Sequence, residues 1–157
     1  GTSYAGGLRA PLGIRWPGRT KAGTVCKEPV TSQDYYSTIA GALGQSDVPC
    51  HDGESLLPLL RDSRAKLGRE ALYWHYPHYY PRMTPGSAVR KGDWKLIHYY
   101  EEDREELFNL RDDPGETKNL AVVHPARAKV LRGRLDDWRQ SVDAKAPTPN
   151  PAWRSRK

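Results

Sequence analysis

Several residue types are scarce in this chain of 157 residues, which contains one Phe, one Met and two Cys. No window approaches the roughly 18 consecutive apolar residues that a membrane-spanning helix requires, so we expect no membrane span. The opening residues lack the charged, apolar and small-residue succession of a signal peptide. No Asn begins an N-x-S/T sequon, so nothing in the sequence indicates N-glycosylation.

The two cysteines, Cys26 and Cys50, leave two interpretations open. They do not form a CxxC pair, and no second pair is present that would complete a zinc site. They are either separate thiols or a disulfide that brackets the helix predicted between them, because the sequence does not give the Cα separation that decides.

The chain begins with Gly1, and its only methionine is Met83. Because a gene product begins with Met unless it is processed, we expect this chain to be a piece of a longer one.

Glycine and proline are abundant, with 14 and 13 residues, which is typical of a loop-rich fold. Five Trp and nine Tyr argue against disorder and predict a core whose aromatic rings carry polar atoms. The net charge is +6. Basic residues gather near the C-terminus, but Asp136, Asp137 and Asp143 interrupt them and no nucleic-acid-binding motif is present. We therefore expect a solvated basic face and no nucleic acid as partner.

The N-terminal part of the chain predicts a strand, a helix and loops. Prolines bracket residues 12–16, which predict a short buried strand. Thr31 and Asp34 form a rough capping box for a helix over residues 32–43, and Gly44 stands where a glycine commonly ends a helix. One apolar stripe of this helix consists of Tyr35 or Tyr36, Ile39 and Leu43. A short helical turn is predicted to end near Pro58.

The C-terminal part predicts an antiparallel meander followed by a helix. The expected strands are residues 71–76, 87–90, 93–100 and 105–110, with a turn at Lys91-Gly92. Pro125 is expected in the first turn of the last helix, whose apolar stripe is Leu131, Leu135, Trp138 and Val142. The predicted fold class is α+β: an antiparallel meander sheet of three to four strands covered by a C-terminal helix, preceded by a strand-helix-loop segment.

The most reactive-looking feature is the stretch WHYPHYYPR at residues 74–82. His75 and His78 could form a metal pair, but zinc usually takes three or four ligands and nothing nearby completes the set. A second interpretation is aromatic packing around hydrogen-bonded histidines. A third is substrate contact, in which aromatic rings stack on sugar rings while His and Arg82 bind hydroxyls or anions.

No other local pattern completes a catalytic site. Gly6-Gly7 followed by Arg9 fits neither common phosphate-binding motif, and no GxSxG elbow is present. The paired acidic residues fall in expected turns or on the last helix, where solvated charge is the ordinary explanation.

Taken in order, five segments resemble the C-terminal portion of a type I sulfatase, the formylglycine-dependent arylsulfatase family. They are YAGGLRAPLGIRWPG, EPVTSQDYYSTIAGALG, DGESLLPLL, AVRKGDWKLI and ELFNLRDDPGETKNLA. The resemblance covers residues 2–138. It departs from the family pattern at Ala5, where the family usually has Glu, and at Ser37, where it has Pro.

The resemblance implies one part of an enzyme that cleaves sulfate esters with a hydrated formylglycine and a Ca²⁺ ion. The formylglycine motif C/S-x-P-S-R and the metal-ligand segments are absent here, and the family's sulfate-binding Lys would immediately precede Gly1. The chain alone is therefore expected to be inactive, with no catalytic residue, no metal ligand and no cofactor of its own. Formylglycine and Ca²⁺ would belong to the missing N-terminal part, which is also an expected partner.

By the same resemblance, residues 1–70 end the large α/β sulfatase domain, residues 71–146 form a C-terminal subdomain, and residues 147–157 form a Pro-rich basic tail. The subdomain would line the substrate pocket, which makes His75, His78, Tyr79 and Arg82 candidate contacts for a sulfated sugar or other sulfated small molecule. Family habit implies a periplasmic or extracellular location. The alternatives are a non-catalytic module that binds an anionic polysaccharide or nucleic acid, and a gene remnant that folds poorly.

Overall fold

The computed structural model describes residues 3–45, 49, 52–81, 83–148 and 150–152. The chain divides into two compact units. The sheet unit comprises Gly1–Ala10 and Glu70–Lys157, and the helical unit comprises Pro11–Arg69. No helix in the described ranges is long and apolar enough to cross a membrane.

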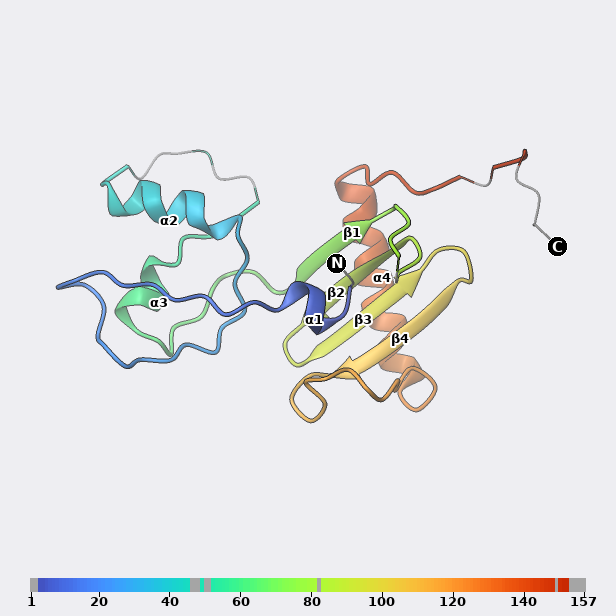
Figure 1. Cartoon of the computed structure of the whole chain (residues 1–157), viewed down its shortest axis with the longest axis horizontal. Helices are drawn as coiled ribbons and strands as arrows, with labels where there is room; N and C mark the ends of the chain where they lie inside the picture. Colours follow the sequence, from blue (N-terminus) through green and yellow to red (C-terminus); the bar gives the residue numbers. More distant parts are fainter. Residues whose placement is uncertain (1–2, 46–48, 50–51, 82, 149, 153–157) are drawn as a thin grey trace. The chain divides into compact units, whose positions relative to one another are not determined.

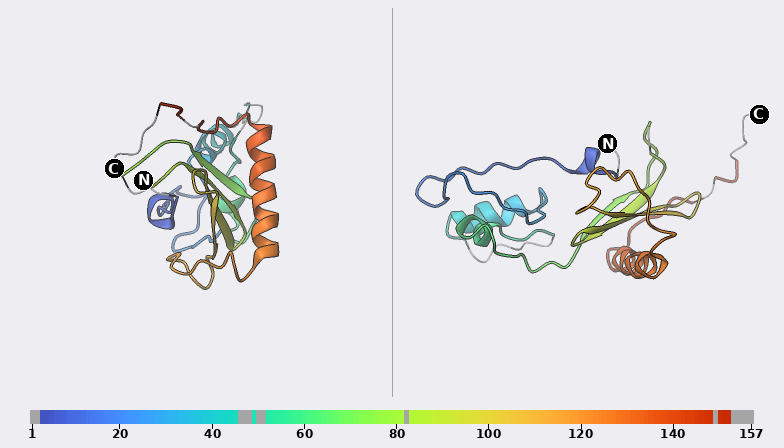
Figure 2. Two further views of the ribbon diagram at one scale, coloured as in Figure 1. Left: turned by 90° about the vertical axis from the view of Figure 1, so that its right-hand side faces the viewer. Right: turned by 90° about the horizontal axis from the view of Figure 1, so that it is seen from below.

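The sheet unit contains four strands in the order β1-β2-β3-β4, each antiparallel to its neighbour. The strands are β1 (Leu72–Tyr76), β2 (Gly86–Lys91), β3 (Trp94–Tyr99) and β4 (Arg104–Asn109), and helix α4 (Pro125–Ser141) follows them. Figure 2 shows α4 along one face of the sheet and the short helix α1 (Ala5–Leu8) on the opposite face. The predicted α+β meander with its C-terminal helix is confirmed.

The first core of this unit lies between the sheet and α4. Val89 pairs with Leu96 and Leu96 pairs with Leu107, which forms an apolar row across three strands. This row packs against Ala128, Leu131 and Leu135 of α4. Each fully buried Leu contributes about 1.5–3 kcal/mol, so the row and the helix stripe stabilise one another.

The opposite face of the sheet, here called the α1 face, carries a second core. Its buried members are Met83, Ala88, Ile97, Tyr99 and Phe108, with Tyr4 packed against them. The sequence predicted one covered face. In the structure both faces are covered. Alternate residues of β3 are buried on both sides of the sheet, because the residues around α1, such as Tyr4, pack on the second face.

The predicted stripe of α4 holds for Leu131, Leu135 and Trp138 but not for Val142. Pro125 lies in the first turn as predicted, and the helix ends at Ser141. Val142 is the C-cap residue and is about half exposed (52%). Trp138 instead stacks on Tyr73, with ring centroids 4.8 Å apart.

The helical unit contains α2 (Asp34–Ala42) and α3 (Leu57–Arg61), which Figure 1 labels. Gly44 has the positive φ of 79° expected after α2. The short helical turn was predicted to end near Pro58, but α3 begins there instead, because proline is well suited to a first helical turn. Cys26 is exposed, and Cys50 lies outside the described residues, so their pairing stays a prediction.

One prediction for the helical unit is wrong, and the stripe of its predicted helix is exposed. Residues 12–16 are irregular rather than a strand, and Leu12 and Ile14 are exposed. The apolar stripe of α2 also points to solvent, with Ile39 and Leu43 61% and 74% exposed. The buried residues of α2 lie on its other side and include Asp34 and Thr38. Both features lack, within the described residues, the neighbour that their pattern requires.

Candidate functional site

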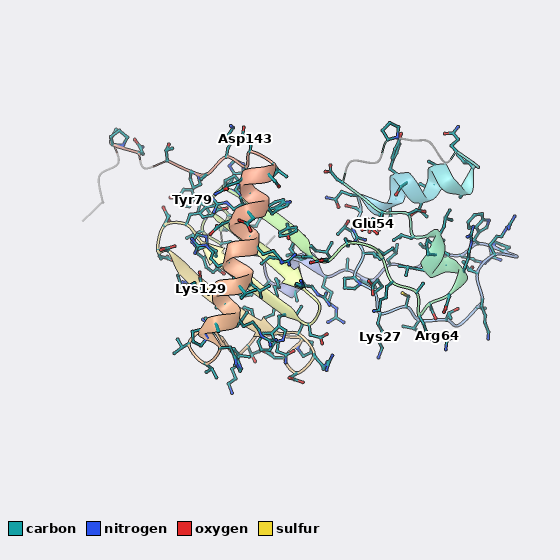
Figure 3. All side chains as sticks on the ribbon, turned by 180° about the vertical axis from the view of Figure 1, so that it is seen from behind. Lys27, Glu54, Arg64, Tyr79, Lys129 and Asp143 are labelled. Carbon is teal, nitrogen blue, oxygen red and sulfur yellow. The ribbon has the colours of Figure 1, made fainter. Side chains whose placement is uncertain are left out.

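The loop between β1 and β2 carries the predicted site residues. His78, Tyr79 and Tyr80 are exposed, and Tyr80 and Met83 exchange two backbone hydrogen bonds of 3.0 Å that close a turn. In Figure 3, Tyr79 lies toward the end of the sheet unit that carries Asp143, just after α4. We call residues 77–81 the aromatic loop. Arg82, the fourth predicted contact, lies outside the described residues.

His75 is held by the protein at both ring nitrogens. Its Nε2 lies 2.9 Å from the Lys145 carbonyl oxygen, to which it must donate. Its Nδ1 lies 2.8 Å from Ser87 Oγ and 2.7 Å from Tyr100 Oη, two hydroxyl groups that can each donate or accept. No nitrogen of His75 is left for a metal ion or a substrate in this arrangement. The side chain instead ties the end of β1 to the segment that follows α4.

His78 and Tyr79 present free surface. The His78 ring meets the Tyr76 ring edge-on, with centroids 5.6 Å apart. Tyr79 is 69% exposed and donates its hydroxyl hydrogen to Glu101, which raises the pKa of that phenol. Tyr80 meets Tyr76 in a second edge-on contact at 6.5 Å. The loop thus displays an aromatic surface with one imidazole and two phenol hydroxyl groups.

A buried polar layer that sequence reasoning missed lies beneath the helix at the same end of the sheet. His98 forms a 2.9 Å contact from Nε2 to Asp103, while its buried Nδ1 has no partner in the described part of the chain. Burial, with Arg132 nearby, lowers the pKa of His98. The register offered a signal, because His75, Ser87 and His98 occupy one cross-strand row.

Asp34, which belongs to one of the family-like segments, has a structural role. Its fully buried carboxylate binds Arg69 at 2.8 Å and 2.5 Å, and accepts the backbone N–H groups of Thr31 at 2.7 Å and Glu54 at 3.0 Å. Burial alone would raise the pKa of Asp34, but these donors outweigh it and lower the pKa. A Cβ on Gly53 would lie 2.2 Å from the Gln33 carbonyl oxygen, so only glycine allows this approach.

Comparison with known proteins identifies the family of this chain. The sequence profile described as "N-sulphoglucosamine sulphohydrolase, C-terminal" matches residues 2–141. The chain belongs to this sulfatase family. A protein named "Sulfatase" from Formosa agariphila is 37% identical over 165 residues, which cover 94% of this chain and 30% of that protein. The "Delta 4,5-hexuronate-2-O-sulfatase" of Bacteroides thetaiotaomicron is 41% identical over 91 residues, which cover 55% of this chain and 18% of that sulfatase.

A solved structure agrees with these relatives. The structure of BT4656 in complex with its substrate D-glucosamine-2-N,6-O-disulfate matches with a TM-score of 0.69 and 28% identity, over 85% of this chain and 28% of that one. The chain therefore spans less than a third of these relatives, and it matches the C-terminal part of this sulfatase family. The sulfatase resemblance is confirmed, and a free-standing binding module for polysaccharide or nucleic acid is not supported.

Calcium and formylglycine are typical of the sulfatase family. In the part of the chain that the structure describes, no group of three His, Cys, Asp or Glu side chains could hold a metal ion. These residues do not fit a Ca²⁺ site.

Proposed function

We propose that the complete protein hydrolyses sulfate esters of a carbohydrate, and that this chain supplies one wall of the substrate pocket. The nucleophile and the metal ligands would lie in the part of the enzyme that precedes this chain. The observation that carries the proposal is the exposed surface of the aromatic loop in a member of a sulfatase family. Relatives named for hexuronate and N-acetylglucosamine sulfates support a sugar as the substrate class.

His78 and Tyr79 are the proposed contacts. An aromatic ring offers a flat apolar face to a sugar ring, while the imidazole and the phenol can bond hydroxyl groups. The N–H of the His78 ring can also donate to a second sulfate group on the sugar. His75 is proposed to support this wall from below, because its ring nitrogens are already bonded within the protein.

The exposed apolar face of α2 is proposed to pack against the N-terminal part of the same sulfatase. Ile39, Leu43 and Tyr36 expose most of their side chains along one side of this helix. Adjacent apolar side chains of this kind mark an interface rather than a solvent surface. Residues 12–16 would pair as a strand with that same part, because their alternation has no ladder partner among the residues described here.

The proposal is tested by replacing His78 with Ala in the complete enzyme. We expect KM for a sulfated sugar to rise about tenfold, as the loss of one good contact implies, while KM for 4-nitrophenyl sulfate changes little. Suitable sugars are N-acetylglucosamine 6-sulfate and a Δ4,5-hexuronate 2-sulfate disaccharide. His124→Ala is the control, because His124 is also exposed but lies at the N-terminal end of α4.

An equal effect of His78→Ala on the aryl and sugar substrates would indicate a packing role and contradict the proposed contact. Measured alone, the 157-residue chain should not hydrolyse either substrate. Turnover by the isolated chain would overturn the assignment of the chemistry to the N-terminal part.

A further inference from the structure

Three segments that are far apart in the sequence meet at one buried ion pair on the α1 face of the sheet. Lys95 of β3 points its Nζ at the carboxylate of Glu116, with 2.5 Å between the atoms, and the two side chains are only 3% and 1% exposed. The second carboxylate oxygen of Glu116 accepts the backbone N–H of Ala5, the first residue of α1.

Burying this ion pair contributes little net free energy to folding, so stability alone does not explain it. Removing two charges from water is unfavourable unless their hydrogen bonds are well made. Burial lowers the pKa of Lys95, and only Glu116 opposes that shift. Glu116 also has a positive φ of 55°, which is uncommon for a residue with a side chain. The turn that begins at Asp113 holds this conformation, since Asp113 accepts from Glu116 N–H at 3.2 Å and from Thr117 N–H at 2.8 Å.

A chain of contacts leads from this pair to the aromatic loop. Next to Ala5, the Tyr4 hydroxyl donates to Glu106 at 2.5 Å and accepts from Tyr99 at 3.0 Å. Ser3 then donates from its backbone N–H and its hydroxyl to the sulfur of Met83, at 3.0 and 3.3 Å. Met83 is buried, and its backbone closes the turn with Tyr80. Residues 3–5 therefore bridge the buried pair and the base of the loop.

We propose that the Lys95–Glu116 pair is a positioning element for the aromatic loop, acting through residues 3–5 and Met83. Glu116 fixes the start of α1, so Ser3 stays against Met83 and the Tyr80–Met83 turn keeps one position. The inference rests on the proposed function of the loop as a substrate wall. It adds that substrate discrimination depends on two residues that never touch the substrate.

Glu116→Gln tests this in the complete sulfatase. A glutamine keeps an acceptor for the Ala5 N–H but leaves the buried Lys95 ammonium without a counter-charge. We expect the Tyr80 amide, measured by hydrogen exchange, to exchange about tenfold faster, and KM for a sulfated sugar to rise severalfold while 4-nitrophenyl sulfate turnover changes less than about twofold. Glu70→Gln is the matched control, because Glu70 is 65% exposed and pairs with Lys91 and Arg134 outside this bridge.

A rescue variant separates positioning from mere loss of stability. Lys95→Met combined with Glu116→Gln removes both charges and keeps the acceptor for Ala5, so the exchange of Tyr80 and the sugar KM should return toward their original values. Met83→Ala interrupts the bridge at its other end and should reproduce the selective loss without affecting the ion pair.

The outcomes are distinct. If Glu116→Gln and Met83→Ala both weaken the two substrates equally, or leave Tyr80 exchange unchanged, the pair does not position the loop. If Tyr80 exchange rises and is rescued while neither Glu116→Gln nor His78→Ala affects the sugar selectively, the bridge exists but the loop is not a substrate wall, and the proposed function fails instead.

Discussion

The buried Asp34–Arg69 pair should hold the helical unit together, and Asp34→Ala tests this directly. The carboxylate is fully buried and accepts four hydrogen bonds, two from the Arg69 guanidinium and two from backbone N–H groups. Its removal leaves a largely buried guanidinium without a counter-charge, since Arg69 is only 15% exposed. Breaking such a pair from one side costs about 3–5 kcal/mol.

Hydrogen exchange of the Leu56 amide in the complete protein is the assay. Leu56 is buried, and its N–H donates to Thr38 Oγ1 at 2.8 Å, so this amide reports opening of the unit. The Thr38 hydroxyl in turn donates to the backbone carbonyl of Asp34, which alanine keeps. Each loss of about 1.4 kcal/mol in the free energy of opening speeds exchange tenfold, so a loss of about 3–5 kcal/mol predicts exchange that is roughly two to four orders of magnitude faster. Asp34→Ala combined with Arg69→Met should recover much of the protection, because no unpaired charge remains.

Asp62→Ala is the control for this prediction. Asp62 is a carboxylate of the same unit, but its pair with Arg64 is 57% and 91% exposed, so Leu56 exchange should not change. If Asp34→Ala left the Leu56 amide as protected as Asp62→Ala does, the buried pair would not hold the unit, and the reasoning from its burial would be refuted.

Two further predictions concern an apolar face and a buried histidine. Ile39→Asp should lower the Tm of the complete protein by several degrees, whereas Val25→Asp, also exposed and in the same unit, should not; equal effects would contradict docking of α2. Stability should fall with pH below 6.5, the ordinary pKa of His98, because the unfolded chain then binds a proton that the folded chain excludes, until the lower folded pKa is reached. In the His98→Gln variant, the urea concentration at the unfolding midpoint should change less with pH over that range.

The elements that the sequence predicted well carry their own periodicity. Residues 93–100 were predicted as a strand, a conformation that puts Leu96 and Ile97 on opposite faces, and both are buried there against different partners. The period of Leu131, Leu135 and Trp138 likewise predicted the buried side of α4. These patterns suffice because the sheet and the helix that cover one another both lie within this chain.

The features that the sequence could not anticipate depend on structure beyond the chain or on distant pairs. Residues 12–16 and the outer face of α2 carry exposed apolar side chains. The described residues contain no neighbour that would bury them. The bonds of His75 depend on Ser87, Tyr100 and Lys145, which are 12 to 70 positions away. A local pattern of aromatic and His residues cannot distinguish a substrate contact from such an anchor. Only the pairing register decides between them.

The contact between Ser3 and Met83 has a chemical consequence of its own. Met83 is the only methionine of these 157 residues, and its sulfur is both buried and hydrogen-bonded. Ser3 lies directly on that sulfur, so movement of residues 3–5 away from the sheet should open it to peroxide. A sulfoxide formed there is polar and no longer fits among Ile97 and Phe108. Oxidation of this one thioether should therefore become faster when the N-terminal segment separates from the sheet.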